Sequence, residues 1–166
     1  MKHKSLLLYS WLVWALTFFI PDMKSTMRFR GWLYFLPFKH AAKNIQIANS
    51  ARLIGLDNIK IGSDTYIASG VVINASDLVT IGDEVMIGHS AVLVSGNHSL
   101  SAGSYRFGSM IRKPIQIDCG SWIGANVTIL AGSKIPKATL IAANSVVTKA
   151  LGISGVYAGI PVKLIK

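Results

Sequence analysis

Residues 59–94 read IKIGSDTYIASGVVINASDLVTIGDEVMIGHSAVLV, and this stretch decides the fold. Within it, an isoleucine or leucine returns at every sixth residue in two successive runs. These residues are Ile61, Ile67, Ile73, Ile81, Ile87 and Leu93. A period of six matches neither the 3.6-residue period of an α-helix nor the two-residue alternation of an amphipathic strand. It indicates a solenoid whose coils have three six-residue sides, with the aliphatic side chains stacked inside a triangular prism.

The same series continues on both sides of this stretch. Its further members are Ile47, Leu53, Ile117, Ile123, Ile129, Ile135, Ile141 and Val147. Gly or Ala often comes next, as in Ile123-Gly124 and Ile141-Ala142. We expect this small neighbour to let the chain turn a tight corner, where Gly or Asn tolerates left-handed backbone angles.

The spacing slips three times, each time on the same side of a coil. Leu53 to Ile61 and Ile73 to Ile81 are eight residues apart, and the next coil carries a far larger insertion over residues 95–114. One side of the prism is therefore expected to bulge and then to extend a long loop. A loop of this length on a regular solenoid usually carries function.

The first 44 residues follow another pattern. Residues 6–20 read LLLYSWLVWALTFFI without a charge, which is short of the roughly 20 apolar residues of a membrane span. No signal-peptide cleavage site follows, and residues 28–39 mix aromatic residues with cations, as the membrane–water interface favours. We interpret residues 1–44 as a short hydrophobic, α-helical membrane-docking segment that contacts lipid through residues 5–39. The alternatives are a helix packed on the protein or on a neighbouring subunit, and secretion.

Composition narrows the function classes. The chain has 166 residues, enough for one domain, and a formal net charge of +10 that implies an acidic partner. The basic residues are spread along the chain and the aromatic residues gather near its N-terminus, which argues against a nucleic-acid partner. A single cysteine, Cys119, suits the cytoplasm and is expected to be a small buried hydrophobe rather than a catalytic thiol.

From residue 45 onward the sequence resembles the hexapeptide-repeat acyltransferases. The motifs that carry the resemblance are IGHSAVLVSGNH over residues 87–98, SWIGANVTILAG over 121–132, IAANSVVTK over 141–149 and YAGIPVK over 157–163. The Gly-Asn-His of the first motif, with Tyr105-Arg106-Phe107, looks closest to xenobiotic acetyltransferases. The hydrophobic N-terminus looks more like polysaccharide O-acetyltransferases of the cell envelope. Ile160 departs from the family ending, which commonly reads Gly-Asn-Pro.

The resemblance implies an all-β fold, a left-handed parallel β-helix of hexapeptide repeats over residues 45–150, with the loop 95–114 and a C-terminal tail at 151–166. It also implies a homotrimer with active sites between adjacent prisms, so that His98 of one subunit faces cofactor contacts of the next.

Acetyl transfer to a hydroxyl needs a base, a donor for the oxyanion and a groove for a long thioester. Histidine suits the base because its charge changes near neutral pH. His98 opens the loop, where the family places its base, whereas His89 is expected at a corner and His3 and His40 lie outside the repeats. Asp77 in the preceding bulge is a side-chain candidate to orient the imidazole. Direct transfer is expected, because no serine or cysteine shows a nucleophile context.

The co-substrate implied by the resemblance is acetyl-CoA, and no metal is expected. The candidate cofactor contacts are Trp122, Gly124, Ala142, Ala143, Lys149 and Lys163. Of these, Trp122 would flank the thioester and the two lysines would meet the coenzyme phosphates. The candidate substrate contacts are Asp77, Asn97, Tyr105 and Arg106. An arginine beside an aromatic ring suits a sugar or an acidic group on it.

Three alternatives bear on function. A γ-class carbonic anhydrase shares the prism but needs three histidines on zinc, and only His89 and His98 lie in the repeats, so a zinc enzyme is rejected. A membrane-associated solenoid scaffold is the non-enzymatic alternative. Among enzymes, we expect an O-acetyltransferase acting on an envelope saccharide of the O-antigen, capsule or exopolysaccharide type, either free or lipid-linked; the alternative acceptor is an antibiotic or serine. The expected location is the cytoplasmic face of the inner membrane.

Overall fold

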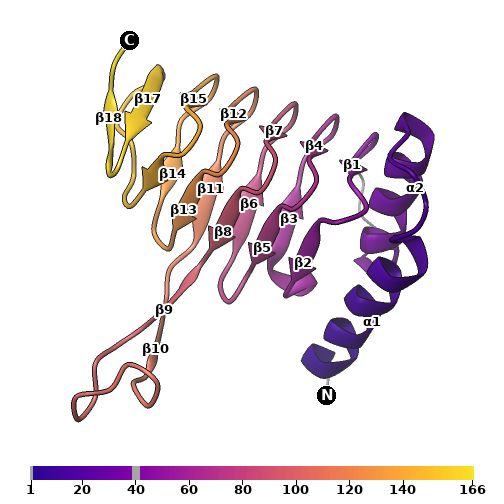
Figure 1. Cartoon of the computed structure of the whole chain (residues 1–166), viewed down its shortest axis with the longest axis horizontal. Coiled ribbons are helices and arrows are strands. Elements are labelled where there is room, and N and C mark those ends of the chain that lie inside the picture. Colours follow the sequence, from indigo (N-terminus) through magenta and orange to yellow (C-terminus); the bar gives the residue numbers. More distant parts are fainter. Residues whose placement is uncertain (1, 39–41) are drawn as a thin grey trace.

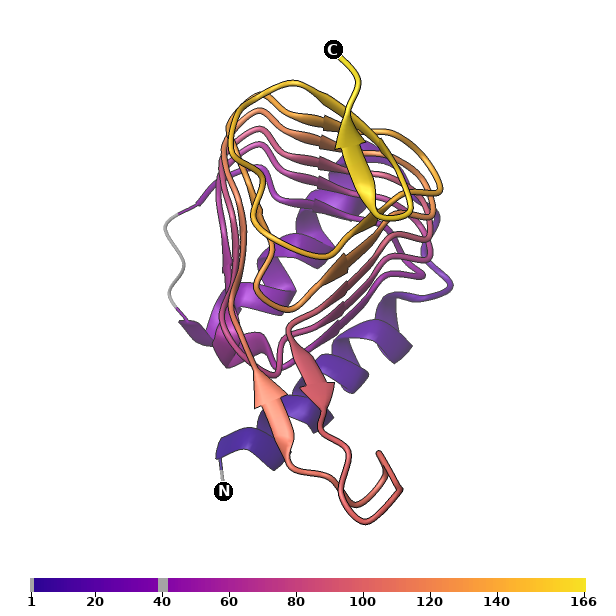
Figure 2. The ribbon, with the colours of Figure 1, turned by 90° about the vertical axis from the view of Figure 1, so that its left-hand side faces the viewer.

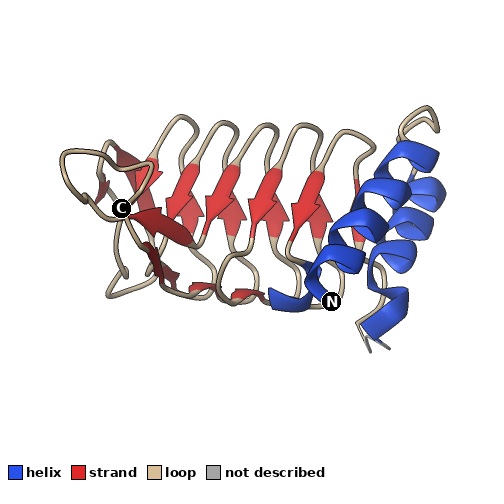
Figure 3. Ribbon diagram, turned by 90° about the horizontal axis from the view of Figure 1, so that it is seen from below, coloured by secondary structure: helices blue, strands red, loops and turns tan. Residues whose placement is uncertain are grey.

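The computed structural model describes residues 2–38 and 42–166. Figure 1 shows a prism of stacked parallel coils with two helices across its N-terminal end. These helices are α1 (Lys2–Thr17) and α2 (Lys24–Phe35), and the short 3₁₀ helix η1 (Leu36–Phe38) follows α2. The helices lie side by side against the first coil (Figure 3).

The coils build three faces, named A, B and C here. Face A contains β1 (Gln46–Ile47), β4 (Tyr66–Ile67), β7 (Met86–Ile87), β12 (Trp122–Ile123), β15 (Leu140–Ile141) and β17 (Val156–Gly159), to which β18 (Val162–Leu164) adds antiparallel. Face B contains β2 (Arg52–Ile54), β5 (Val72–Asn74), β8 (Val92–Val94), β13 (Thr128–Leu130) and β16 (Val146–Val147). Face C contains β3 (Ile59–Ile61), β6 (Val79–Ile81), β11 (Ile115–Ile117) and β14 (Lys134–Ile135), with the 3₁₀ helix η2 (Leu56–Asn58) before β3. The predicted left-handed parallel β-helix is confirmed, and Figure 2 shows it along its axis.

The hexad residues form the core of the prism. On face A, Ile47, Ile67, Ile87, Ile123 and Ile141 pair in register from coil to coil. Every aliphatic residue of the predicted series is at most 3% exposed. Because each coil places the same residue type over its equivalent, the side chains fill the prism as continuous columns. Full burial of one such side chain stabilises the fold by about 1.5–3 kcal/mol.

The corners correct one expectation. The residues with left-handed backbone angles on the two regular edges stand third after the aliphatic residue, not next to it. They are Asp64, Gly70, Glu84, Ser90, Gly120, Asn126, Ala138 and Asn144. The small neighbour has a different cause, which Gly124 illustrates. A Cβ atom there would lie 2.7 Å from both the backbone nitrogen of Ala143 and the carbonyl oxygen of Ile141, so the next coil leaves it no room.

The slips in spacing are confirmed, and all lie on the edge between faces B and C. The insertion in the third coil is an antiparallel hairpin rather than an irregular loop. Its strands are β9 (Gly96–His98) and β10 (Met110–Arg112). It projects away from the prism in both Figure 1 and Figure 2. At the C-terminal end, residues 151–166 continue the solenoid, because β17 pairs with β15.

The helices are closely fitted to the first coil. Gly31 faces β1, and a Cβ atom there would lie 2.1 Å from the carbonyl oxygen of Ile45. The guanidinium of Arg30 is 1% exposed and forms an ion pair with Asp22 at 3.0 Å. Its other hydrogen bonds go to Thr17, Ile20 and Ile47.

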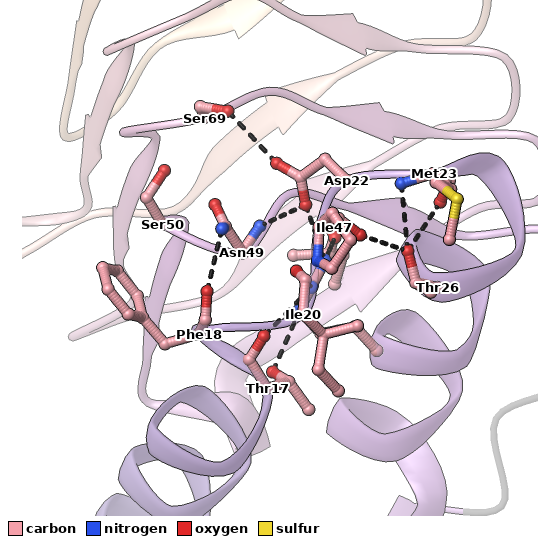
Figure 4. Close-up of polar contacts among 12 residues, drawn as sticks. Thr17, Phe18, Ile20, Asp22, Met23, Thr26, Ile47, Asn49, Ser50 and Ser69 are labelled. Atoms are coloured by element: carbon pink, nitrogen blue, oxygen red, sulfur yellow. Dashed lines mark hydrogen bonds and ion pairs between the residues drawn. The ribbon is translucent and has the colours of Figure 1, made fainter.

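Asp22 also ties the helices to the corners of the first two coils. Its carboxylate accepts a hydrogen bond from the backbone nitrogen of Asn49 at 2.8 Å and one from the hydroxyl of Ser69 at 3.4 Å (Figure 4). The Asn49 side chain donates to the carbonyl oxygen of Phe18. The predicted helical N-terminal segment is therefore a fixed part of the fold.

Among the described residues, no helix has both the length and the apolar character that crossing a bilayer requires. Cys119 lies at the corner between faces C and A and is exposed, so the expectation of a buried cysteine was wrong. It stands second after the inward-facing Ile117, where the corner turns side chains outward.

Candidate functional site

His98 ends β9 and lies on the exposed hairpin that leaves the edge between faces B and C. It pairs with Met110 across the hairpin, and Asn97 pairs with Ile111. Within residues 2–38 and 42–166, no hydrogen bond or ion pair to the imidazole is present. The ring is therefore open to a substrate, to water or to a second chain.

Ser95 fixes the root of this hairpin, and the sequence analysis did not single it out. Its buried hydroxyl accepts from the backbone nitrogen of Asp77 at 2.8 Å and donates to the carbonyl oxygen of the same residue at 2.9 Å. On the returning side of the hairpin, the backbone nitrogen of Lys113 donates a hydrogen bond to the carbonyl oxygen of Ser95 at 3.1 Å. The His98 strand thus begins at a bonded, buried position, although the imidazole itself is exposed.

Asp77 has a local role within one chain. Its carboxylate accepts from the backbone nitrogen of Leu78 at 2.7 Å, and its backbone holds Ser95. No hydrogen bond joins it to His98 in the described part of the chain. Asp77 therefore shapes the corner from which the hairpin leaves.

The end of the hairpin carries Tyr105 and Arg106, both exposed. The Arg106 guanidinium lies 5.8 Å from the centre of the Phe107 ring. This places a cation beside an aromatic ring beyond His98, next in sequence to the exposed Tyr105. Such a surface can stack on a sugar ring or pair with an acidic group.

A groove of about 250 Å³ lies on the outside of face A. Its lining residues are Tyr66, Ala68, Met86, Ile87, Gly88, His89, Trp122 and Ala125. Trp122 is 48% exposed and pairs with Met86, which pairs with Tyr66, so three large side chains line up across successive coils. Each directly precedes an inward isoleucine, so strand alternation would have identified Tyr66 and Met86 as outward residues.

His89 lies at the corner beside this groove and is exposed, as predicted. Gly124 is buried on the same edge, between faces A and B, and Ala142 and Ala143 follow it one coil later. The size of Gly124 is set by the stacking of the coils, as shown above. Small residues therefore occupy this edge beside Trp122.

The two candidate phosphate contacts lie elsewhere. Lys149 is exposed after β16, on the edge between faces B and C, and Lys163 is exposed on β18, where it pairs with Ala158. Trp122 lies on face A, and Gly124, Ala142 and Ala143 lie on the edge between faces A and B. His98 lies on the hairpin that projects from the edge between faces B and C. One chain therefore does not bring the predicted base and the predicted cofactor contacts together.

In the described ranges, no group of three or more His, Cys, Asp or Glu side chains could hold a metal ion.

No protein-family model matches the chain. Individual relatives do. The chain is 35% identical over 109 residues to a galactoside O-acetyltransferase of Escherichia coli, covering 66% of this chain and 54% of that protein. It is 29% identical over 142 residues to a putative lipopolysaccharide biosynthesis O-acetyltransferase of the same organism, covering 82% and 61%. The chain thus spans about half to three fifths of the length of these curated relatives.

Solved structures give the same picture over nearly the whole chain. A hexapeptide-repeat acetyltransferase from Vibrio cholerae, solved with acetyl coenzyme A, superposes with a TM-score of 0.79 at 27% identity. The match covers 98% of this chain and 87% of the other. The agreement therefore includes the helices as well as the prism.

Proposed function

Because the chain belongs to the hexapeptide-repeat acyltransferase family, we propose that it is an O-acetyltransferase that transfers acetyl from acetyl-CoA to a saccharide hydroxyl, with His98 as general base. The observation that carries the proposal is the hairpin of the third coil. It presents an exposed imidazole on a strand whose root is fixed by Ser95, with aromatic and cationic side chains beyond it.

The working site needs two chains. His98 stands on the hairpin from one edge of the prism, while Trp122, Gly124 and Ala142 lie on face A and another edge. A neighbouring prism brings its own face A toward the hairpin, so that the two sets of residues can meet. A homotrimer closes this contact by threefold symmetry and makes three equal sites.

The outer surfaces of the faces support this arrangement. Face A presents a largely apolar ladder outward, made of Tyr66, Met86, Trp122, Leu140 and Val156. Face C presents Lys60, Thr80, Gln116 and Lys134 in the equivalent register. An apolar outer ladder favours contact with another chain or with pantetheine, and a polar ladder favours water.

The chemistry at His98 is general base catalysis. The imidazole accepts the proton of the acceptor hydroxyl while its oxygen attacks the acetyl carbonyl carbon. As the carbon–sulfur bond breaks, the imidazolium returns the proton to the sulfur, so that free CoA leaves as a thiol. Oxyanion stabilisation falls to backbone N–H groups near the edge of the coil. No acyl-enzyme is formed in this scheme.

An envelope saccharide is the acceptor that we favour over a small diffusible one. The named activities of the relatives are a galactoside acetylation and a lipopolysaccharide biosynthesis step. The exposed Tyr105 and the Arg106–Phe107 pair suit a sugar with acidic substituents. Since acetyl-CoA is a cytoplasmic metabolite, the reaction is assigned to the cytoplasm. An antibiotic or serine acceptor is the alternative enzyme reading, and a scaffold is the non-enzymatic one.

The test is CoA release from acetyl-CoA, measured as free thiol, with galactosides, envelope oligosaccharides, serine and a streptogramin antibiotic as acceptors. His98→Asn should lower the acceptor-dependent rate by about 10²–10⁴, which is typical of losing a positioned base. His89→Asn is the matched control, because it removes the other repeat histidine. If the protein binds no acetyl-CoA, the result supports the scaffold alternative. If only His89→Asn loses activity, His89 and not His98 is the base.

A further inference from the structure

The helices at the end of the prism are inverted relative to ordinary surface helices. In α1 the polar residues face the protein: Ser10 and Thr17 are buried, and the hydroxyl of Ser10 donates to the carbonyl oxygen of Leu53. The opposite sides of the helical layer are apolar. Its exposed large hydrophobic side chains are Leu7, Leu8, Trp11, Leu12, Leu16, Phe19, Met23, Phe29, Trp32 and Leu36. Because the polar groups of this layer face the protein, its exposed apolar side chains are expected to contact another apolar surface.

Further contacts fix the orientation of the two helices, so this apolar surface stays exposed. Besides the Arg30–Asp22 pair, the Tyr9 hydroxyl donates to the carbonyl oxygen of Leu33 at 2.5 Å. The guanidinium of Arg52 in the first coil lies 4.2 Å from the Trp14 ring. These contacts join α1, α2 and the prism on the inner side. The outward side is therefore the apolar side in the folded chain.

The most exposed members lie on the outside of α1 and just after it. Leu16 is 76% exposed and Phe19 is 89% exposed. On α2, the exposed Phe29 and Trp32 rings stack at 5.9 Å. Tryptophan and phenylalanine on an amphipathic helix are typical of segments that lie in the headgroup region of a bilayer.

Charge distinguishes between possible occupants of this surface. Asp22 is the single acidic residue between residues 1 and 38, and it is paired with Arg30. Lys4, Lys24 and Arg28 are exposed on the same layer, and no acidic side chain pairs with them in the described ranges. A second copy of the chain would bring like charges together, whereas anionic lipid headgroups complement them.

We propose that the outer surface of the α1–α2 layer binds the surface of an anionic lipid bilayer, with both helices lying in the interface. The 16 residues of α1 span about 24 Å, less than the roughly 30 Å of a bilayer's hydrocarbon core, which fits binding in the plane rather than crossing. This inference rests on the helical layer alone and not on the acetyl-transfer chemistry. The trimer proposed above would place three such layers at one end of the assembly and strengthen binding by multivalency.

The test is cosedimentation of the full chain with vesicles of equal parts phosphatidylcholine and phosphatidylglycerol, and with phosphatidylcholine alone. The wild type should bind the mixed vesicles, and added salt should weaken this binding. The double variant Leu16→Ser/Phe19→Ser should bind about tenfold more weakly or worse, since apolar insertion drives interfacial binding. The matched control is Ile153→Ser/Ile165→Ser, which changes two exposed apolar residues, 60% and 63% exposed, at the other end of the chain and should bind like the wild type.

A second pair isolates charge without touching the apolar stripe. Lys4→Gln/Lys24→Gln should lower binding to the mixed vesicles, while Lys60→Gln/Lys134→Gln on face C should not. Equal vesicle binding by the wild type and the Leu16/Phe19 variant overturns the proposal. Failure of the wild type to bind the mixed vesicles also overturns it. Loss of self-association in that variant, without vesicle binding by the wild type, assigns the surface to a second copy. Acetylation of a soluble acceptor, measured on the same variants, reports on the proposed function separately.

Discussion

Replacement of Arg30 by methionine should cost about 3–5 kcal/mol of unfolding free energy, because it removes the buried partner of an ion pair and the donor to several buried acceptors. The Arg30 side chain is 1% exposed and donates five hydrogen bonds, to the Asp22 carboxylate, the Thr17 hydroxyl and three backbone carbonyl oxygens. Methionine fills similar volume but satisfies none of these acceptors. The carbonyl oxygen of Ile47 is the costliest of them, since it lies in the first coil beneath the helices.

Asp22→Asn should cost less, about 1–2 kcal/mol, because the Asp22 side chain is 26% exposed and the amide still accepts from Asn49. The double variant with Arg30→Met should be less destabilised than the sum of the two, because each single variant already removes the pair. The coupling should fall within the roughly 0.5–3 kcal/mol measured for contacting residues.

Urea unfolding of the three variants at one protein concentration measures these values, since assembly would shift apparent stability. Arg28→Met is the control, because Arg28 is exposed on the same helix and should change stability by less than about 0.5 kcal/mol. An Arg30→Met cost below about 1 kcal/mol, or one equal to that of Arg28→Met, would refute the view that this buried guanidinium fixes the helical layer.

Three further predictions follow from individual contacts. Burial raises the pKa of Tyr34 to about 12, so the folded state holds this proton more tightly than the unfolded state and stability falls as the pH rises from about 10 toward 12; Tyr34→Phe should remove about 1.4 kcal/mol of this fall between urea titrations at about pH 8 and about pH 11, and should be near neutral at the lower pH because the hydroxyl has no partner in the described chain. Gly124→Ala should lower stability by about 1–3 kcal/mol, because its Cβ atom would meet Ala143 in the next coil, whereas Gly152→Ala, with open space around it, should not. Ser95→Ala should cost about 1–3 kcal/mol and speed proteolysis within the hairpin while leaving the core folded; a hairpin cut at the wild-type rate would contradict its role as the root of that strand.

Much of the fold could be predicted because the solenoid is locally encoded. Each coil repeats the same inward residue, so Ile67 and Ile87 stack without any information from distant parts of the chain. The register slip from Ile73 to Ile81 likewise located the hairpin edge correctly. The position of the left-handed corner residue was wrong by two places, because the small neighbour of the aliphatic residue is required by coil stacking and not by backbone angle.

The candidate site was only partly predictable. His98 and the exposed residues of the hairpin stand out because they interrupt the repeat. Ser95 does not stand out, because its role depends on hydrogen bonds to the preceding coil. Met86 was missed because the hexad pattern follows inward residues; strand alternation marks it as outward, and the register of neighbouring coils places it beside Trp122.

By itself, the sequence determined the prism, its three faces and the coil that carries the hairpin, because a period of six is a local property that stacking only repeats. The tertiary structure decided the rest. It showed that His98 and Gly124 lie on different edges of the prism, since that depends on how far the chain turns between them. It also decided which side of α1 faces outward, because residues 6–20 are mostly apolar and contacts such as those of Ser10 with the first coil and of Thr17 with Arg30 select one side.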